Sequence, residues 1–272
     1  MAANAEGAPA LALALPDSPM RGRPRQIAVV LATLVNLGLN GLAGAGVLFG
    51  RDTGAVSDAA RTPITPAGWT FAVWSVIFLG AAVFAVWQAL PAQRGARYDA
   101  LGAPAVLAGL LNGLWQIPWL LERFGIAALV IAGILGSLVW LYVRLDAMRL
   151  AGPELWALGV PTALWMAWLS VAAPLNWTIW LRDLGWTPAG TLATAAPVAL
   201  LVAVGGVLAW LLARTGDAAA AAVALWAFLG IWAQNGRDEA IAAALAVAAF
   251  VVLAGLAVGM RRTASAWPTA QA

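Results

Sequence analysis

The sequence contains no cysteine and no histidine. The absence of cysteine excludes a disulfide framework and a thiolate nucleophile. Without histidine as well, a Cys/His metal site and an imidazole ligand to haem are excluded. We therefore expect no metal site and no bound cofactor. All fifteen basic residues are arginine, and this use of Arg without Lys, together with abundant Ala, favours a bacterial source.

Charge is scarce as well, since only 10% of the residues are charged and 63% are apolar. A soluble domain needs far more polar surface than this. The charged residues form short clusters between apolar stretches of about 20 residues, the length of a helix that crosses a bilayer. Because helices satisfy their own backbone in lipid, the sequence predicts an all-α, polytopic transmembrane helical bundle. The arginines mark span ends, so no nucleic-acid partner is expected.

Eight apolar segments are predicted to span the membrane. They lie near residues 27–49, 68–90, 102–121, 124–143, 155–181, 190–213, 218–234 and 240–260. With eight spans, both termini share a side, which holds ten arginines against five on the other. The positive-inside bias then places both termini in the cytoplasm. Combined with the bacterial source, this predicts an integral protein of the inner (plasma) membrane.

The predicted spans carry no Asp, Glu, Arg or His near the bilayer midplane. Ionisable groups at that depth usually mark proton relays and ion-coupled transport. Acid–base catalysis inside the membrane would need them too. Their lack argues against a proton-driven pump and against an enzyme, and we assign no catalytic residue.

Tryptophan is abundant instead, with sixteen residues. An indole N–H in an apolar site usually finds a partner. Deep tryptophans beside deep asparagines therefore indicate either interhelical hydrogen bonds or a ligand pocket, and composition alone favours the hydrogen bonds. The tryptophans away from the charged edges are Trp74, Trp115, Trp165, Trp168 and Trp226.

Two further patterns concern packing between helices. Asn36 and Asn40 lie four residues apart, so they share one helical face and favour contact with a neighbouring helix over a place in a pocket wall. Gly46 and Gly50 in the first span and the pair Gly205–Gly206 in the sixth have the small side chains that allow close helix packing.

Three motifs shift the balance towards a pocket. Residues 65–74 read TPAGWTFAVW at the start of the second span, residues 111–116 read LNGLWQ in the third, and residues 168–176 read WLSVAAPLN in the fifth. In this order and on these spans, they resemble the translocator protein family (TspO/MBR), also called tryptophan-rich sensory proteins. The resemblance covers roughly residues 27–181, and the additional spans resemble the longer bacterial branch of the family.

The composition of the N-terminal segment and the resemblance together predict a division of the chain into four parts. A disordered cytoplasmic tail over residues 1–25 precedes a TspO-like five-helix membrane domain over residues 26–184. Three additional transmembrane helices then occupy residues 185–262, and residues 263–272 form a C-terminal tail.

The resemblance also implies a pocket inside the five-helix bundle for a planar apolar molecule, either porphyrin-like or sterol- or isoprenoid-like. The positions that match the family's pocket are Trp74, Asn112, Trp115, Trp168, Ala172 and Asn176. Indole faces would stack on a planar ring, and an indole N–H or an amide would fix one polar group. For Asn112 and Asn176, interhelical hydrogen bonding is an equal alternative. Membrane lipid and a second copy of the chain are the other expected partners.

The leading hypothesis is thus a sensory or translocator-like membrane protein that binds a planar apolar ligand, with a tetrapyrrole favoured. The alternative is a facilitative permease for a small apolar or amphipathic metabolite, because three extra helices could form a second bundle. Porphyrin breakdown has been suggested for the family. It is the least favoured activity here, because His, Cys and buried carboxylates are missing from the spans.

Overall fold

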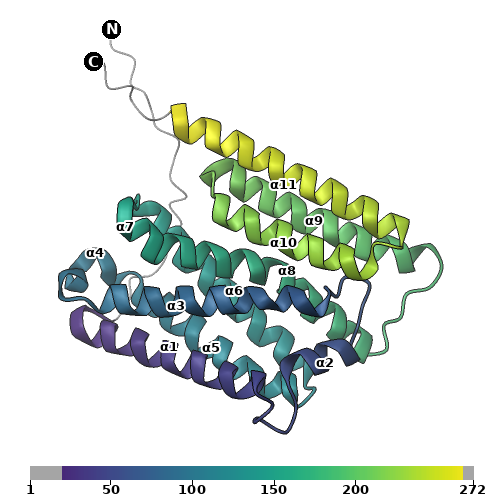
Figure 1. Ribbon diagram of the computed structural model, residues 1–272, viewed down its shortest axis with the longest axis horizontal. Coiled ribbons are helices and arrows are strands. Elements are labelled where there is room, and N and C mark those ends of the chain that lie inside the picture. The colour runs from purple at the N-terminus through teal and green to yellow at the C-terminus, as the bar shows by residue number, and fades with distance from the viewer. Residues whose placement is uncertain (1–19, 266–272) are drawn as a thin grey trace.

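The computed structural model describes residues 20–265, and the helical prediction is confirmed throughout this range (Figure 1). Residues 1–19 and 266–272, which include most of both predicted tails, lie outside the described residues. Within the described range, eight helices are long and apolar enough to cross a membrane, as predicted. The long helices of these spans are α1 (Gly22–Gly44), α3 (Val73–Ala89), α5 (Gly102–Leu120), α6 (Phe124–Ala147), α8 (Val160–Asp183), α9 (Thr191–Thr215), α10 (Ala218–Asn235) and α11 (Glu239–Ser265), and short helices that adjoin α3, α5 and α8 belong to the same spans.

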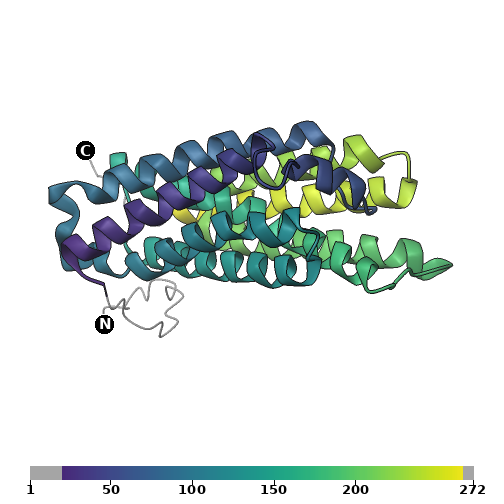
Figure 2. The same ribbon diagram turned by 90° about the horizontal axis from the view of Figure 1, so that it is seen from below.

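The first five of these helices form a closed ring. Each contacts two neighbours, in the order α1, α5, α6, α8, α3 and back to α1. The helices run nearly parallel to the long axis of the molecule, which Figure 2 shows from below. Because a ring of five helices surrounds a central space, side chains that point inward from α3, α5 and α8 can meet there.

Short helices connect the spans at the two ends of the ring. Four of them are α2 (Thr53–Ala59), the 3-10 turn η1 (Gly68–Ala72), the 3-10 turn η2 (Pro91–Arg94) and α4 (Ala96–Asp99). The other two are α7 (Gly152–Glu154) and the π-helical turn η3 (Leu155–Gly159), which lead into α8. The Asp52 carboxylate caps α2 by accepting a hydrogen bond from Ala55 N at 2.8 Å, so this helix begins where its N-terminal backbone N–H group finds a partner.

The last three helices form a second layer beside the ring (Figure 1). Helix α10 lies against α8 and η1, while α9 and α11 pack on each other and on α10. A single cluster of buried apolar residues extends from Val73 in α3 to Val252 in α11. The additional helices therefore share their core with the ring and do not form a separate bundle.

Close packing of α9 on α11 depends on glycine. A Cβ on Gly205 would lie 2.7 Å from the Cβ of Ala248, and a Cβ on Gly255 would overlap the carbonyl oxygen of Ala209. The prediction of close packing is thus correct for Gly205 but wrong for Gly46 and Gly50. Those two follow the end of α1, adopt positive φ angles of 68° and 67°, and have no atom within 4 Å of an added Cβ.

The first helix also begins earlier than predicted. Helix α1 starts at Gly22, so Arg25 belongs to this helix and not to the tail. Its guanidinium is fully buried, donates to Gln88 Oε1 at 3.0 Å and lies 3.3 Å from Asp99 Oδ1. Hydropathy predicts that the first span begins after Arg25, because a hydropathy scale treats every arginine as solvated. It takes no account of a charge that is paired with a carboxylate distant in the sequence, here that of Asp99.

Candidate ligand-binding site

A cavity of about 240 Å³ lies inside the ring, in the half nearer to α2. Its wall is built from α1, α2, η1, α3, α5, α6 and α8, and Ala227 of α10 completes it. All six residues predicted from the motifs line this cavity: Trp74, Asn112, Trp115, Trp168, Ala172 and Asn176. The structure therefore brings together side chains from three separate spans.

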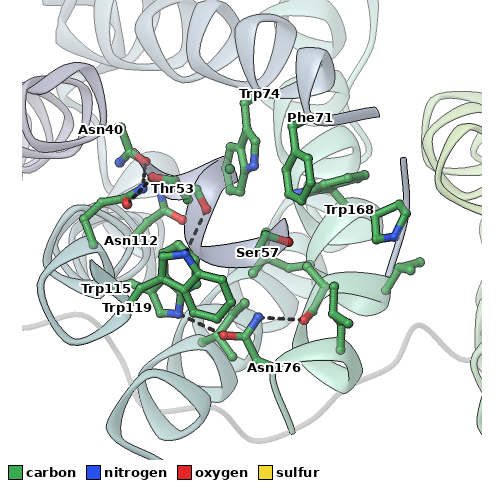
Figure 3. Close-up of a pocket in the computed structure, with 18 of the residues that line it drawn as sticks. Asn40, Thr53, Ser57, Phe71, Trp74, Asn112, Trp115, Trp119, Trp168 and Asn176 are labelled. Atoms are coloured by element: carbon green, nitrogen blue, oxygen red, sulfur yellow. Dashed lines mark hydrogen bonds between the residues drawn. The ribbon is translucent and has the colours of Figure 1, made fainter. Parts of the chain in front are cut away.

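Aromatic rings form two opposite walls of the cavity (Figure 3). On one side, Trp74 stacks on Phe78 with ring centroids 5.1 Å apart. On the other side, Trp115 stacks on Trp119 at 4.8 Å. Trp168 meets Trp74 edge to face at 6.2 Å. Ring pairs at these separations attract one another, so the walls are packed aromatic surfaces that are largely apolar.

The two predicted asparagines use their amide groups within the protein. Asn112 Nδ2 donates to Asn36 Oδ1 at 2.7 Å, which ties α5 to α1. Asn176 Nδ2 donates to Ala172 O at 3.0 Å, while Asn176 Oδ1 accepts from Trp115 Nε1 at 3.3 Å. Of the two alternatives for these residues, interhelical hydrogen bonding is realised for both, even though both also line the cavity.

Trp168 differs from the other predicted residues. Its side chain is only 3% exposed, and among the described residues its Nε1 has no hydrogen-bond partner. A buried donor left without a partner costs about 1–3 kcal/mol. Trp168 lines the cavity, so this donor without a partner belongs to a residue of the cavity wall.

Sequence reasoning missed several cavity residues. Thr53 and Ser57 come from α2, whose seven residues lie between the first two spans and give no hydropathy signal. Trp119 donates from Nε1 to Thr53 O at 3.1 Å and so holds α2 over the cavity. The spacing of Trp115 and Trp119, one helical turn apart, was the available signal for the second aromatic wall.

The interior of the cavity is uncharged. The ionisable residue in its wall is Asp58, whose side chain is 53% exposed and pairs with Arg61 at 2.8 Å. Among residues 20–265, no group of three or more Asp or Glu side chains is placed to hold a metal ion. The arrangement therefore offers stacking surfaces, and among its donors the buried Trp168 N–H has no partner within the described residues.

The family assignment rests on one comparison. The family described as TSPO-like protein matches residues 26–259, which include all eight long helices almost completely. Neither the curated proteins nor the solved structures compared with the chain gave a match. The match extends past the five-helix ring into α11, so the additional helices are part of the family's own pattern. The chain therefore belongs to the TSPO-like protein family and is an integral membrane protein.

Proposed function

We propose that this protein is a membrane receptor that binds a planar apolar ligand in the cavity inside the ring, without catalysing a reaction on it. The observation that carries the proposal is the buried N–H of Trp168, which lacks a partner among the described residues and lies in an aromatic wall. A ligand carbonyl, ring nitrogen or carboxylate would accept this hydrogen bond. The stacked pairs Trp74–Phe78 and Trp115–Trp119 would hold the flat body of the ligand.

The size of the cavity bears on the identity of the ligand. Its volume of about 240 Å³ is just below the range of about 300–1,000 Å³ that is usual for small-molecule sites. A compact ring system with one polar group fits the cavity as it stands. A tetrapyrrole is larger, so its binding would require α2 and the segment after it to move outward. Helix α2 makes few contacts with other helices, which favours such a movement.

The direct test is quenching of tryptophan fluorescence by protoporphyrin, using purified wild type, Trp168→Phe and Trp168→Ala. Trp168→Phe keeps a ring in the wall but removes the donor, so we expect affinity to fall about fivefold to tenfold, the value of one hydrogen bond. Trp168→Ala also removes the ring face and weakens binding further.

A matched control is Trp156→Phe, because the Trp156 side chain is 71% exposed and is not part of the cavity wall. It removes one indole, as Trp168→Phe does, and should leave the affinity at the wild-type value. If Trp168→Phe and Trp168→Ala both bind protoporphyrin as Trp156→Phe does, the cavity is not the binding site.

The packing of the opposite half of the ring favours binding over passage. There, a second apolar cluster that includes Val29, Phe84 and Leu158 is buried between the helices. The cavity thus lies at one end of the bundle, above a core whose own hollow measures only about 30 Å³. The alternative permease predicts saturable flux of the same ligand into liposomes, whereas a receptor predicts tight binding without flux.

We also propose the location and orientation of the protein. Helix α1 begins and α11 ends at the same end of the bundle (Figure 1), where ten of the fifteen arginines lie near helix termini. The positive-inside bias supports a bacterial inner membrane with this end in the cytoplasm.

A further inference from the structure

A second hollow opens on the outside of the bundle, where α8 ends and α9 begins. It is a groove of about 540 Å³ and is larger than the interior cavity. Thr178 and Leu181 of α8 form one side, and Ala196 and Leu200 of α9 form the other. Leu181 is among the exposed large apolar residues, as expected for a side chain that faces lipid. The groove is therefore an apolar surface that the bilayer can reach.

The two charged residues in the wall of the groove are both basic. They are Arg61 and Arg182, and the wall contains no Asp or Glu. Asp58 pairs with Arg61. Arg182 takes part in none of the ion pairs between described residues, and one of its nitrogens donates to Arg61 O. A guanidinium carries five N–H donors, so Arg182 keeps both its charge and further donors for an anion.

The position of the charge matches the membrane boundary. Helix α8 ends at Asp183 and α9 begins at Thr191, so Arg182 lies where the spans end. Trp186, which is 45% exposed, also lines the groove. Indoles and arginines at this depth contact lipid head groups, and basic pockets between transmembrane helices bind acidic ones.

We propose that this groove is a binding site for a phospholipid with an acidic head group, whose phosphate meets Arg182 and whose acyl chain lies between α8 and α9. Charge complementarity selects this occupant, because the apolar wall continues into the bilayer and the Arg182 cation in it has no acidic partner among the described residues. Ile64, which is 4% exposed, belongs to the walls of both hollows. The bound lipid would thus lie directly against the wall of the interior cavity.

The role of the Arg182 charge in lipid binding is tested by native mass spectrometry of the purified full chain titrated with phosphatidylglycerol or phosphatidylcholine. Wild type should retain phosphatidylglycerol in preference to phosphatidylcholine. Arg182→Gln should reduce this preference about fivefold, the size of a solvent-accessible charge pair. Arg182→Lys should restore most of it. Arg237→Gln is the matched control, because Arg237 is an exposed arginine at the same end of the bundle but outside the groove.

The shape of the groove is tested by a second matched pair. Ala196 lines the groove, whereas its neighbour Ala195 is exposed and does not. Ala196→Leu should fill the groove and reduce retention of phosphatidylglycerol, while Ala195→Leu should leave retention unchanged.

Three results would overturn the proposal. The first is an equal lipid preference in Arg182→Gln and Arg237→Gln. The second is a failure of Arg182→Lys to restore the preference. Arg182 would then act only through its hydrogen bond to Arg61 O, and its charge would play no part in lipid binding. The third is a lipid-free dimer that depends on Arg182, which would make the groove an interface between two copies. None of these readouts involves Trp168, so the cavity and the groove can fail separately.

Discussion

Asn36 occupies the centre of a chain of amide hydrogen bonds between α1 and α5. Its Oδ1 accepts from Asn112 Nδ2 at 2.7 Å and from Asn40 Nδ2 at 2.9 Å. Asn40 Oδ1 in turn accepts from Gln116 Nε2 at 2.6 Å, and Gln116 Oε1 accepts from Thr53 Oγ1 at 2.8 Å. This chain runs from the core of the ring to the start of α2, so it positions the cover of the cavity as well as the two helices.

Replacing Asn36 with leucine removes the acceptor that two buried amides share. Interhelical hydrogen bonds in membranes contribute about 0.6–1.7 kcal/mol each, so we expect Asn36→Leu to destabilise the protein by about 1–2 kcal/mol. Thermal unfolding in detergent measures the effect. Ser170→Ala is the control, because Ser170 Oγ donates to Met166 O within its own helix. Equal unfolding temperatures for the two variants would show that the amide chain does not hold α1 to α5.

Helix α10 fixes the segment that opens the second span. Ala67 N donates to Gly230 O at 2.9 Å, and Trp226 Nε1 donates to Thr70 O at the same distance. Asn235 Nδ2 donates to Thr65 O at 2.8 Å. These bonds satisfy backbone groups of the segment that precedes α3, inside the membrane protein, where water cannot do so. Since Gly68 and Phe71 line the cavity, α10 sets the position of the cavity wall.

The close approach of α10 depends on Gly230. A Cβ at this position would overlap the buried side chain of Thr70. Gly230→Ala should therefore push α10 away from η1, at a cost of about 1–3 kcal/mol, and should weaken protoporphyrin binding through displacement of Phe71. Thermal unfolding and fluorescence quenching report the two effects.

Gly206→Ala provides the matched control for this element. Gly206 lies in α9, and a Cβ there would have no atom within 4 Å. This variant should be neutral or slightly more stable, because alanine favours the helix over glycine. A Gly230→Ala protein that unfolds and binds like Gly206→Ala would contradict the role assigned to α10.

On the scale of the whole molecule, hydropathy predicted the spans, and the motifs predicted which side chains meet. The eight spans and the convergence of Trp74, Asn112 and Trp168 on one cavity agree with the structure. The hydrogen bond between Asn112 and Asn36 could not be predicted, because the register between two helices is decided by packing of all their side chains. The position of α2 over the cavity could not be predicted for a different reason. It depends on hydrogen bonds that join α2 to Trp119 and Gln116, and the hydropathy of α2 itself does not indicate them.

The orientation of the bundle can be tested cleanly because the chain contains no cysteine. Ala59 in α2 and Ala147 at the end of α6 are both exposed and lie at opposite ends of the bundle. With both termini in the cytoplasm, a membrane-impermeant maleimide added to intact bacterial cells should modify Ala59→Cys. Ala147→Cys should react only after the cells are permeabilised, which also serves as the control for reactivity. The opposite pattern would place the cavity and the basic groove on the cytoplasmic side. The arginine bias would then be overridden by another determinant of insertion.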